Sequence, residues 1–209
     1  MSENADQGRQ PSRAEVARQV LSDPVRCQDL LGRIFPDREI AAVENIRRVD
    51  IPSGQDWIHC LRMNVYASGK EQMVFYDLLL GLSDVSDMQD DHIAKLIRYC
   101  RDWMWLNDRP SHEGRTLIIL FSTEELFDGK HCEYDFNGMT DLETGARLDT
   151  GTEYIMLTPK GKQSEIDPKL ANVLNLFEHV VAKGDPLVDE FVRQNELLKQ
   201  QIAAGTEKA

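Results

Sequence analysis

Residues 61–121 contain the pattern that most restricts the fold of this chain. Two strand-like segments, at residues 61–67 and 73–82, flank the short polar segment 68–71, which is typical of a hairpin turn, and the second segment is almost continuously apolar. A helical pattern follows at residues 91–106, and the run Thr-Leu-Ile-Ile-Leu-Phe at 116–121 has the composition of a buried strand. A hairpin, a helix and a buried strand in this order predict a small α/β domain.

The flanking segments extend this domain at both ends. Residues 1–12 are polar, and we expect them to be disordered. Ser12 with Glu15 matches a capping box and predicts a helix to residue 21, and Asp23 before Pro24 predicts a second helix that Pro36 ends. Residues 39–49 then lead towards the sheet.

The C-terminal third predicts two more strands and two helices. Residues 132–136 and 153–157 are expected to form an antiparallel extension of the sheet, separated by a glycine-rich turn region around Gly138, Gly145 and Gly151. Helices are predicted at 168–181 and from residue 185 to about 202. The expected organisation is therefore a disordered start at 1–12, a domain at 13–182, a C-terminal amphipathic helix at 183–204 and a tail at 205–209.

Composition and charge narrow the class of protein. The 209 residues are 41% hydrophobic, which is enough to form a hydrophobic core. The formal net charge of −12 argues against a general nucleic-acid binder, although a local basic groove could still bind nucleic acid. The sequence has no apolar run of the ~18–20 residues that a membrane span needs, and no signal-peptide core. The four cysteines are scattered without metal-ligand spacing. We expect a cytoplasmic protein with reduced thiols.

The two strands also resemble a known family. Residues 62–67 read Arg-Met-Asn-Val-Tyr-Ala and residues 76–81 read Tyr-Asp-Leu-Leu-Leu-Gly. They resemble the PD-(D/E)XK nuclease superfamily, and within it the recombination-promoting nuclease/putative transposase family, whose strands carry patterns like Arg-Leu-Asp-Val-Tyr-Ala and Tyr-Asp-Ile-Glu-Met-Gln. Residues 149–161 and 166–170 are also similar to that family. The resemblance implies a restriction-endonuclease-like mixed β-sheet flanked by helices, with the last helix as an extension.

The residues that carry the chemistry differ from the family pattern. By this resemblance Asn64 stands at the metal-binding aspartate, Leu79 at the glutamate, and Gly81 at the glutamine or lysine. Nucleases of this superfamily hold Mg²⁺ through strand carboxylates, and Mg²⁺ prefers anionic oxygen ligands. Asn64 offers one neutral oxygen, and the side chains of Leu79 and Gly81 offer none. We therefore predict a degenerate active site and no cofactor.

An active enzyme with relocated ligands is the alternative. Asp77 lies two residues before Leu79 on the same face of a strand, Glu71 lies at the hairpin and could move inward, and Glu44 could supply the helix carboxylate that some relatives use. The simpler interpretation makes Asp77 a strand residue and the two glutamates surface charges. The alternative requires Mg²⁺ and would make the protein a DNA endonuclease.

Weaker signals concern contacts with partners. Lys160 and Lys162 flank Gly161 in a basic turn that could touch phosphate, and Arg98 is a basic residue of the predicted helix. A calcium loop in the acidic linker 83–91 lacks the regular ligand spacing. The sequence thus favours a regulatory protein that binds a protein partner, for example one that inhibits a nuclease or a host-defence system. The last helix could also form a homodimer, and the sequence does not decide this point.

Overall fold

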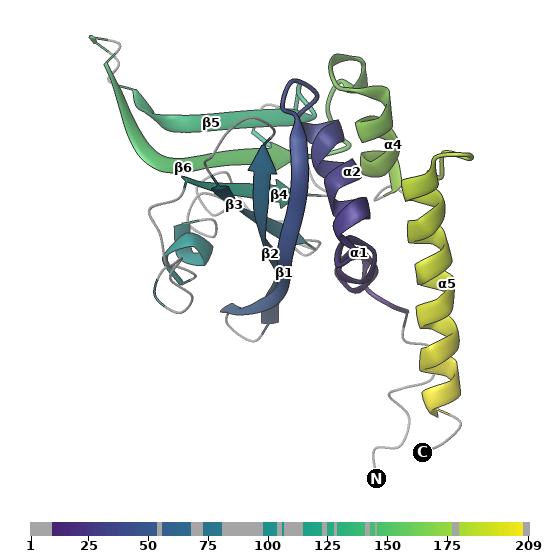
Figure 1. Ribbon diagram of the computed structural model, residues 1–209. Helices are drawn as coiled ribbons and strands as arrows, with labels where there is room; N and C mark the ends of the chain where they lie inside the picture. The colour runs from purple at the N-terminus through teal and green to yellow at the C-terminus, as the bar shows by residue number, and fades with distance from the viewer. Residues whose placement is uncertain are drawn as a thin grey trace.

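A computed structural model gives the fold of this chain. It describes residues 10–53, 56–67, 73–80, 98–103, 106, 115–122, 125–127, 129–140, 143–144, 146–176 and 180–206. The fold is mixed α/β: helices lie against both faces of one β-sheet, and a long helix closes the C-terminal side (Figure 1). The expectation of a mixed sheet flanked by helices, with a C-terminal helix, is confirmed at this level.

Both N-terminal helices begin where their caps predict. Helix α1 (Arg13–Leu21) has Ser12 as its N-cap, and the hydroxyl of Ser12 and the carboxylate of Glu15 form the reciprocal hydrogen bonds of a capping box. Helix α2 (Pro24–Ile34) starts with a proline, and the Asp23 carboxylate accepts hydrogen bonds from the first free N–H groups. Local sequence alone therefore sets these two starts.

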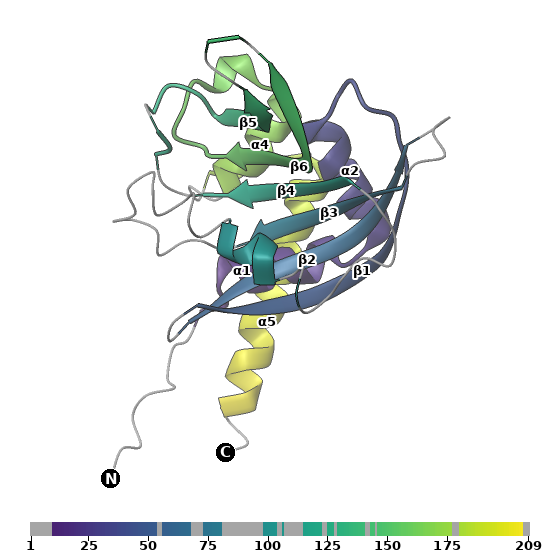
Figure 2. The same cartoon turned by 90° about the vertical axis from the view of Figure 1, so that its left-hand side faces the viewer.

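Six strands of the described chain form one sheet in the order β1-β2-β3-β4-β6-β5. Their bounds are β1 (Ile40–Ser53), β2 (Asp56–Ala67), β3 (Met73–Leu80), β4 (Arg115–Phe121), β5 (Glu133–Thr140) and β6 (Arg147–Leu157). The first three strands pair antiparallel, β4 lies parallel to both β3 and β6, and β5 pairs antiparallel with β6. Figure 2 shows β1 and β5 at opposite edges of this sheet.

The sheet separates two apolar cores. The first face, which carries Leu61, Met63 and Val65 on β2, packs against α1, α2, α4 (Pro168–Leu176) and α5 (Pro186–Thr206). The second face, which carries Cys60, Ile118 and Met156, packs against the helical residues 98–103 and the loop near Leu126. Helices therefore cover both faces, which is the condition for a largely apolar central strand such as β4.

Charged contacts connect the C-terminal helices to α2. The guanidinium of Arg33 donates two hydrogen bonds to the carboxylate of Asp185, at 2.8 and 2.9 Å, and both side chains are buried. Asp185 also accepts hydrogen bonds from the backbone N–H groups of Leu187 and Val188 at the start of α5. The Arg26 guanidinium lies 3.1 Å from the Glu190 carboxylate. These contacts fix α5 against the domain.

Two expectations about the C-terminal third are wrong. Gly138 and Gly151 do not form a turn but lie inside β5 and β6, because the two strands continue well beyond residues 136 and 153. Gly138 has a φ of 71° at a β-bulge, which a glycine adopts without strain. The helix predicted at 168–181 is also shorter: its described part is α4 (Pro168–Leu176), residues 177–179 lie outside the described chain, and Val180 is non-helical and 58% exposed.

Several expectations lie outside the described residues. They are the disorder of residues 1–9, the linker 83–91, the helix start at 91–97, the tail at 207–209, and the candidate positions Glu71 and Gly81.

Candidate functional site

The strand register defines the surroundings of Asn64, the central candidate position. Asn64 on β2 lies opposite Glu44 on β1 and opposite Phe75 on β3. Residues that pair directly share a face, so this row lies on the second face of the sheet. Glu44 is exposed and Asn64 is half-buried. A β-bulge follows Glu44, where Asn45 has a φ of 52°.

Asp77 is closer to Asn64 in the register than Leu79 is. Asp77 pairs with Arg62, two residues from Asn64, whereas Leu79 pairs with Cys60, four residues away. Standard strand spacing puts the Cα atoms of Asn64 and Asp77 about 8 Å apart, and those of Asn64 and Leu79 about 14 Å apart. Asp77 is therefore the acidic position on β3 that belongs with Asn64.

Arg62 is the charged residue at the centre of this region. Arg62 is only 5% exposed, and the register places Asp77 opposite it on β3 and Arg47 opposite it on β1. A buried guanidinium needs a counter-charge, because an uncompensated buried charge costs several kcal/mol, of the order of 3–5. Asp77 has the charge and the register position for this role. Such a role would compete with metal binding by the same carboxylate.

The helical residues 98–103 pack on the second face beside these strands. Cys100 is fully buried and Trp103 packs against the second core, as the apolar spacing of the sequence predicts. The Tyr99 hydroxyl donates a 2.7 Å hydrogen bond to the Pro52 carbonyl on β1, and the Arg101 guanidinium lies 3.3 Å from the Tyr154 hydroxyl on β6. Arg98 is exposed on this segment.

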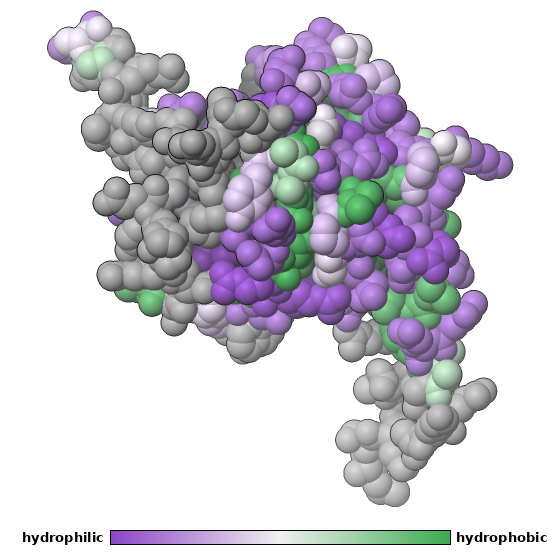
Figure 3. All heavy atoms as spheres, viewed as in Figure 1, coloured by the Kyte–Doolittle hydropathy of each residue, from purple (hydrophilic) through white to green (hydrophobic). Residues whose placement is uncertain are grey.

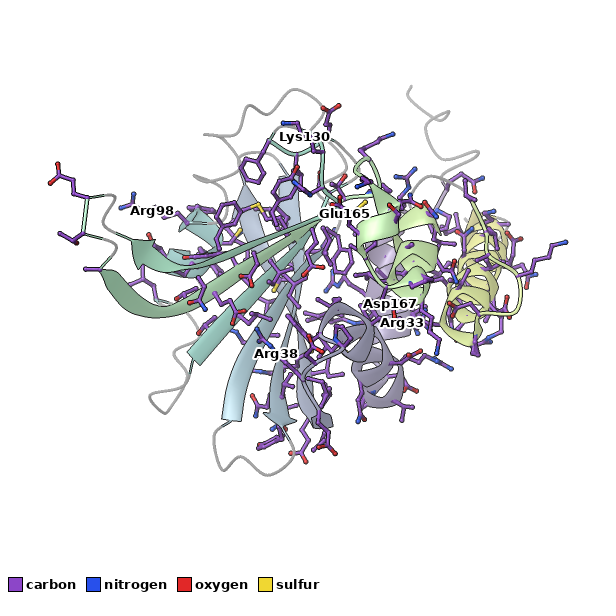
Figure 4. The ribbon with its side chains drawn as sticks, turned by 90° about the horizontal axis from the view of Figure 1, so that it is seen from above. Arg33, Arg38, Arg98, Lys130, Glu165 and Asp167 are labelled. Atoms are coloured by element: carbon purple, nitrogen blue, oxygen red, sulfur yellow. The ribbon has the colours of Figure 1, made fainter. Side chains whose placement is uncertain are left out.

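Lys160 and Lys162 lie in a different region from Arg98. The backbone N–H of Lys162 donates to the carbonyl of Lys130, which joins the loop after β6 to the loop before β5. Figure 4 shows Lys130 and Glu165 near each other and Arg98 well away from both. The three basic residues singled out from the sequence therefore do not form one patch.

The corner around Lys162 is internally paired. The Glu165 carboxylate binds the Lys162 ammonium at 2.7 Å and the His131 Nδ1 at 2.8 Å. Hydrogen bonds from Lys162, then from His131, lower the pKa of Glu165 below its ordinary value. Gly161 packs so tightly on the His131–Cys132 peptide that a Cβ would overlap that backbone. This geometry explains the sequence of the turn without a ligand.

The outer strand β5 has a two-sided character that the sequence reading missed. Glu133 and Asp135 lie on the first face, where they pair with Leu157 and Ile155, whereas Tyr134 and Phe136 lie on the second face, opposite Met156 and Tyr154. The signal was present in the sequence, because acidic and aromatic residues alternate strictly from 133 to 136.

The acidic side of β5 is electrostatically strained. Burial, followed by the nearby charge of Asp135, raises the pKa of Glu133, and burial, followed by the charge of Glu153, raises the pKa of Asp135. The Arg38 guanidinium binds Glu153 through two contacts, the shorter 2.5 Å, and stacks 4.4 Å from the Phe35 ring centroid. Arg38 thus acts on two of these carboxylates, Glu153 by direct contact and Asp135 through its charge.

The aromatic side of β5 is partly open. The Phe127 ring lies 4.8 Å from the Tyr134 ring and 5.4 Å from the Phe136 ring, between centroids, and Phe136 is 42% exposed. The Tyr134 hydroxyl donates to the Leu126 carbonyl and accepts from the His131 backbone N–H. These hydrogen bonds hold the rings in place, while Phe136 keeps a large face in solvent.

An apolar groove of about 440 Å³ lies on the helical side. Its apolar lining comes from Val16 on α1, Leu176 at the end of α4, Val181, and Phe191 and Val192 on α5. Figure 3 shows apolar surface over α5 within a mostly hydrophilic face. Such a groove is the kind of surface that a binding protein or a homodimer would use.

Within the described residues, His, Cys, Asp and Glu side chains form no group of three that could hold a metal ion. All four cysteines are buried and unbridged, and burial raises the pKa of the Cys27 thiol to about 12. Among the described helices, none combines the length and apolar character needed to span a bilayer.

Comparison of the chain with protein-family models, with curated proteins and with solved structures finds no match.

Proposed function

We propose that this protein is a catalytically inactive relative of the PD-(D/E)XK nucleases that acts by binding a protein partner. The proposal is carried by two features together: the order in which the strands are connected, and the loss of carboxylates at the strand positions that would bind a metal. A three-stranded antiparallel meander is followed by β4, parallel to β3, and the helical residues between them lie on the second face. This arrangement is what a restriction-endonuclease-like fold would have. The strand positions that would bind metal carry Asn64 and Leu79.

The chemistry of Asn64 and Leu79 supports inactivity. A Mg²⁺ ion attracted by one neutral amide oxygen loses most of the charge interaction that two carboxylates would supply. Asp77, the acidic position on β3 nearest to Asn64 in the register, lies opposite the buried Arg62. We propose from this register that Asp77 neutralises Arg62, so that its substitution should affect stability more than metal affinity.

A metal-dependent DNA endonuclease remains the second candidate, because one observation favours it. Glu44 lies directly opposite Asn64 on one side, and Asp77 lies diagonal to it on the other. The Cα atoms of the two acids are about 11–12 Å apart by standard strand spacing, with Asn64 between them. A Mg²⁺ ion over Asn64 would require both carboxylates to reach inward from their strands.

A metal titration combined with a cleavage assay separates the two candidates. Calorimetry with Mg²⁺ and Mn²⁺ and nicking of supercoiled plasmid are measured on the wild type and on Asp77→Ala. The proposal expects neither metal binding nor nicking in the wild type, and a less stable Asp77→Ala protein. Metal-dependent nicking that Asp77→Ala abolishes, in a variant that remains folded, would establish the endonuclease instead.

A restored variant tests the relationship to nucleases directly. Asn64→Asp combined with Leu79→Glu returns the two acids of the family pattern, and Asn64→Asp alone supplies an acid diagonal to Asp77. If Asp77 holds the second ligand position, the single variant gains Mg²⁺ affinity and the change at Leu79 adds little. A gain only in the double variant would favour the alignment given by the resemblance.

The partner and the compartment belong to the same proposal. A net charge of −12 favours a protein partner with basic surface over nucleic acid, because phosphates would be repelled. Inhibition of a nuclease or of a host-defence system would use such complementarity. The apolar groove along α5 offers a surface for a homodimer, and the cytoplasm remains the predicted location.

A further inference from the structure

We propose that the outer edge of β5 docks an extended segment of a protein partner in which basic and apolar side chains alternate. The inference rests on the proposed binding role and adds the place and the chemistry of the contact. The mode is strand addition, in which a partner strand continues the sheet through main-chain hydrogen bonds and its side chains provide specificity.

The position of β5 supplies the backbone for this contact. β5 ends the sheet, with β6 as its neighbour on one side, and Asp135, Phe136 and Asn137 are exposed. An edge strand directs alternate N–H and C=O groups outward, where another strand can pair with them. The regular stretch is residues 133–137, because the bulge at Gly138 interrupts the register beyond it.

The two faces of β5 specify the side chains of the added strand. A strand beside β5 places alternate residues next to Glu133 and Asp135 on the first face and next to Tyr134 and Phe136 on the second. Lysine or arginine fits the first position, since it would meet two carboxylates. A β-branched or aromatic side chain fits the second, where 42% of Phe136 is open to solvent.

The charges of this edge explain why the partner is basic. Arg38 binds Glu153, so the acidic side of β5 has more carboxylates than cations among its described neighbours. The pKa values of Glu133 and Asp135 lie above their ordinary values, first because of burial and then because of neighbouring acids. An incoming cation would relieve this repulsion and gain interaction energy at a partly desolvated site.

The same charges argue against two other occupants. A second copy paired antiparallel through β5 would bring acidic residues opposite acidic residues, and like charges directly opposite are destabilising. The bases of a nucleic acid could stack on the rings of Tyr134 and Phe136. Its phosphates, however, would be repelled by the carboxylates on the first face of β5. The two-sided pattern therefore favours a peptide strand.

Peptide binding to the full chain tests the proposal. The probe is a short capped peptide of alternating Lys and Val, and the matched peptide has Glu in place of Lys. Affinity is measured by calorimetry at low ionic strength, and the contacted backbone is located by amide-resolved NMR. We expect the Lys peptide to bind with NMR shifts centred on residues 133–137, and the Glu peptide to bind at least about tenfold more weakly.

Three variants locate the contact. Asp135→Lys reverses an exposed charge on the edge and should weaken binding about tenfold or more, and Phe136→Ser should weaken it several-fold by removing the apolar side. Glu196→Lys makes the same charge change on α5, where the Glu196 side chain is 58% exposed, and should leave the affinity within about twofold of wild type. All three positions are exposed, and circular dichroism checks that each variant is folded.

Three outcomes would overturn the inference. The first is that the Lys peptide shows no measurable binding. The second is that Asp135→Lys and Glu196→Lys lower the affinity for the peptide equally. The third is that an oligothymidylate binds the same residues and displaces the peptide. The first two would show that β5 is not a specific docking edge, and the third would assign this surface to nucleic acid. None of them changes the result of the metal and cleavage measurements, so the two proposals fail separately.

Discussion

The guanidinium of Arg33 forms a two-point hydrogen-bonded ion pair with the carboxylate of Asp185, and both residues are more than nine-tenths buried. The pair lies between α2 and the start of α5, and Arg33 also binds Asp29 on its own helix and the Lys169 carbonyl on α4. Asn172 on α4 donates a further hydrogen bond to Asp185. Three helices therefore meet at one buried charge cluster.

Removal of one partner should destabilise the protein strongly. Arg33→Ala leaves the Asp185 carboxylate buried without its cation, which costs about 3–5 kcal/mol of the free energy of unfolding. Urea denaturation monitored by circular dichroism measures this change. Lys199→Ala is the control, because its partner Glu196 is largely exposed and such a pair contributes below about 1 kcal/mol. Equal effects of the two substitutions would contradict the structural role of Arg33.

The same cluster predicts a loss of stability in acid. Burial alone would raise the pKa of Asp185, but hydrogen bonds from Arg33 and Asn172 and the Arg33 charge outweigh it and lower the pKa from 3.8 to about 2. A carboxyl with a depressed folded-state pKa stabilises the fold above its ordinary pKa and loses that contribution as the pH falls towards the folded value. The contribution is about 2 kcal/mol.

This pH effect can be assigned to Asp185 by comparison. The free energy of unfolding is measured between about pH 4 and pH 2 for the wild type and for Asp185→Asn. The wild type should lose more stability over this range, because the asparagine does not titrate. Parallel curves for the two proteins would exclude Asp185 as the source.

Neutralisation of the β5 acids should have the opposite effect on stability. Because the pKa values of Glu133 and Asp135 are raised in the folded state, each carboxylate destabilises the fold at a pH above its raised pKa, and the effect vanishes below its ordinary pKa. Asp135→Asn should therefore stabilise the protein at pH 7 by less than about 1 kcal/mol, and not at strongly acidic pH. Thermal unfolding at both pH values measures this. A lower melting temperature at pH 7 would contradict it.

Two glycines offer a matched pair of alanine substitutions. Gly161→Ala would place a Cβ on the backbone of His131 and should cost about 1–3 kcal/mol through overpacking. Gly32→Ala lies within α2, where a Cβ meets no atom within 4 Å, and should stabilise the protein by about 0.5–1 kcal/mol. The denaturation midpoints of the two variants should move in opposite directions. An unchanged midpoint for Gly161→Ala would show that the loop containing Gly161 and the loop containing His131 can separate.

Local signals predicted the two N-terminal helix starts and the buried strand β4, whereas β1 (Ile40–Ser53) was not predicted as a strand. The capping box of Ser12 and Glu15 and the Asp23-Pro24 start each depend on residues within one turn, so the sequence contains the whole interaction. The apolar run at 116–121 needed no partner to be identified as a buried strand, and β4 occupies it. Contacts between residues that are close in the sequence can be inferred without knowing the fold.

Features that depend on long-range pairing could not be predicted. The extension of β5 and β6 through Gly138 and Gly151 depends on cross-strand pairing that overrides the turn preference of glycine. The register that places Asp77 opposite Arg62 depends on where the hairpin turns, and a shift by two residues would place another residue beside Asn64. The contact between Arg38 and Glu153 joins positions that are 115 residues apart. Each of these determines the chemistry of a candidate site.

The separation of 152 positions between Arg33 and Asp185 has a consequence for synthesis on the ribosome. At roughly 5–20 residues per second, Arg33 is added to the chain roughly 8–30 s before Asp185. During that interval Arg33 has the carboxylate of Asp29 on its own helix but lacks its buried partner, Asp185. The buried ion pair that connects α2 with α5 can therefore form only late in synthesis, when the start of α5 docks.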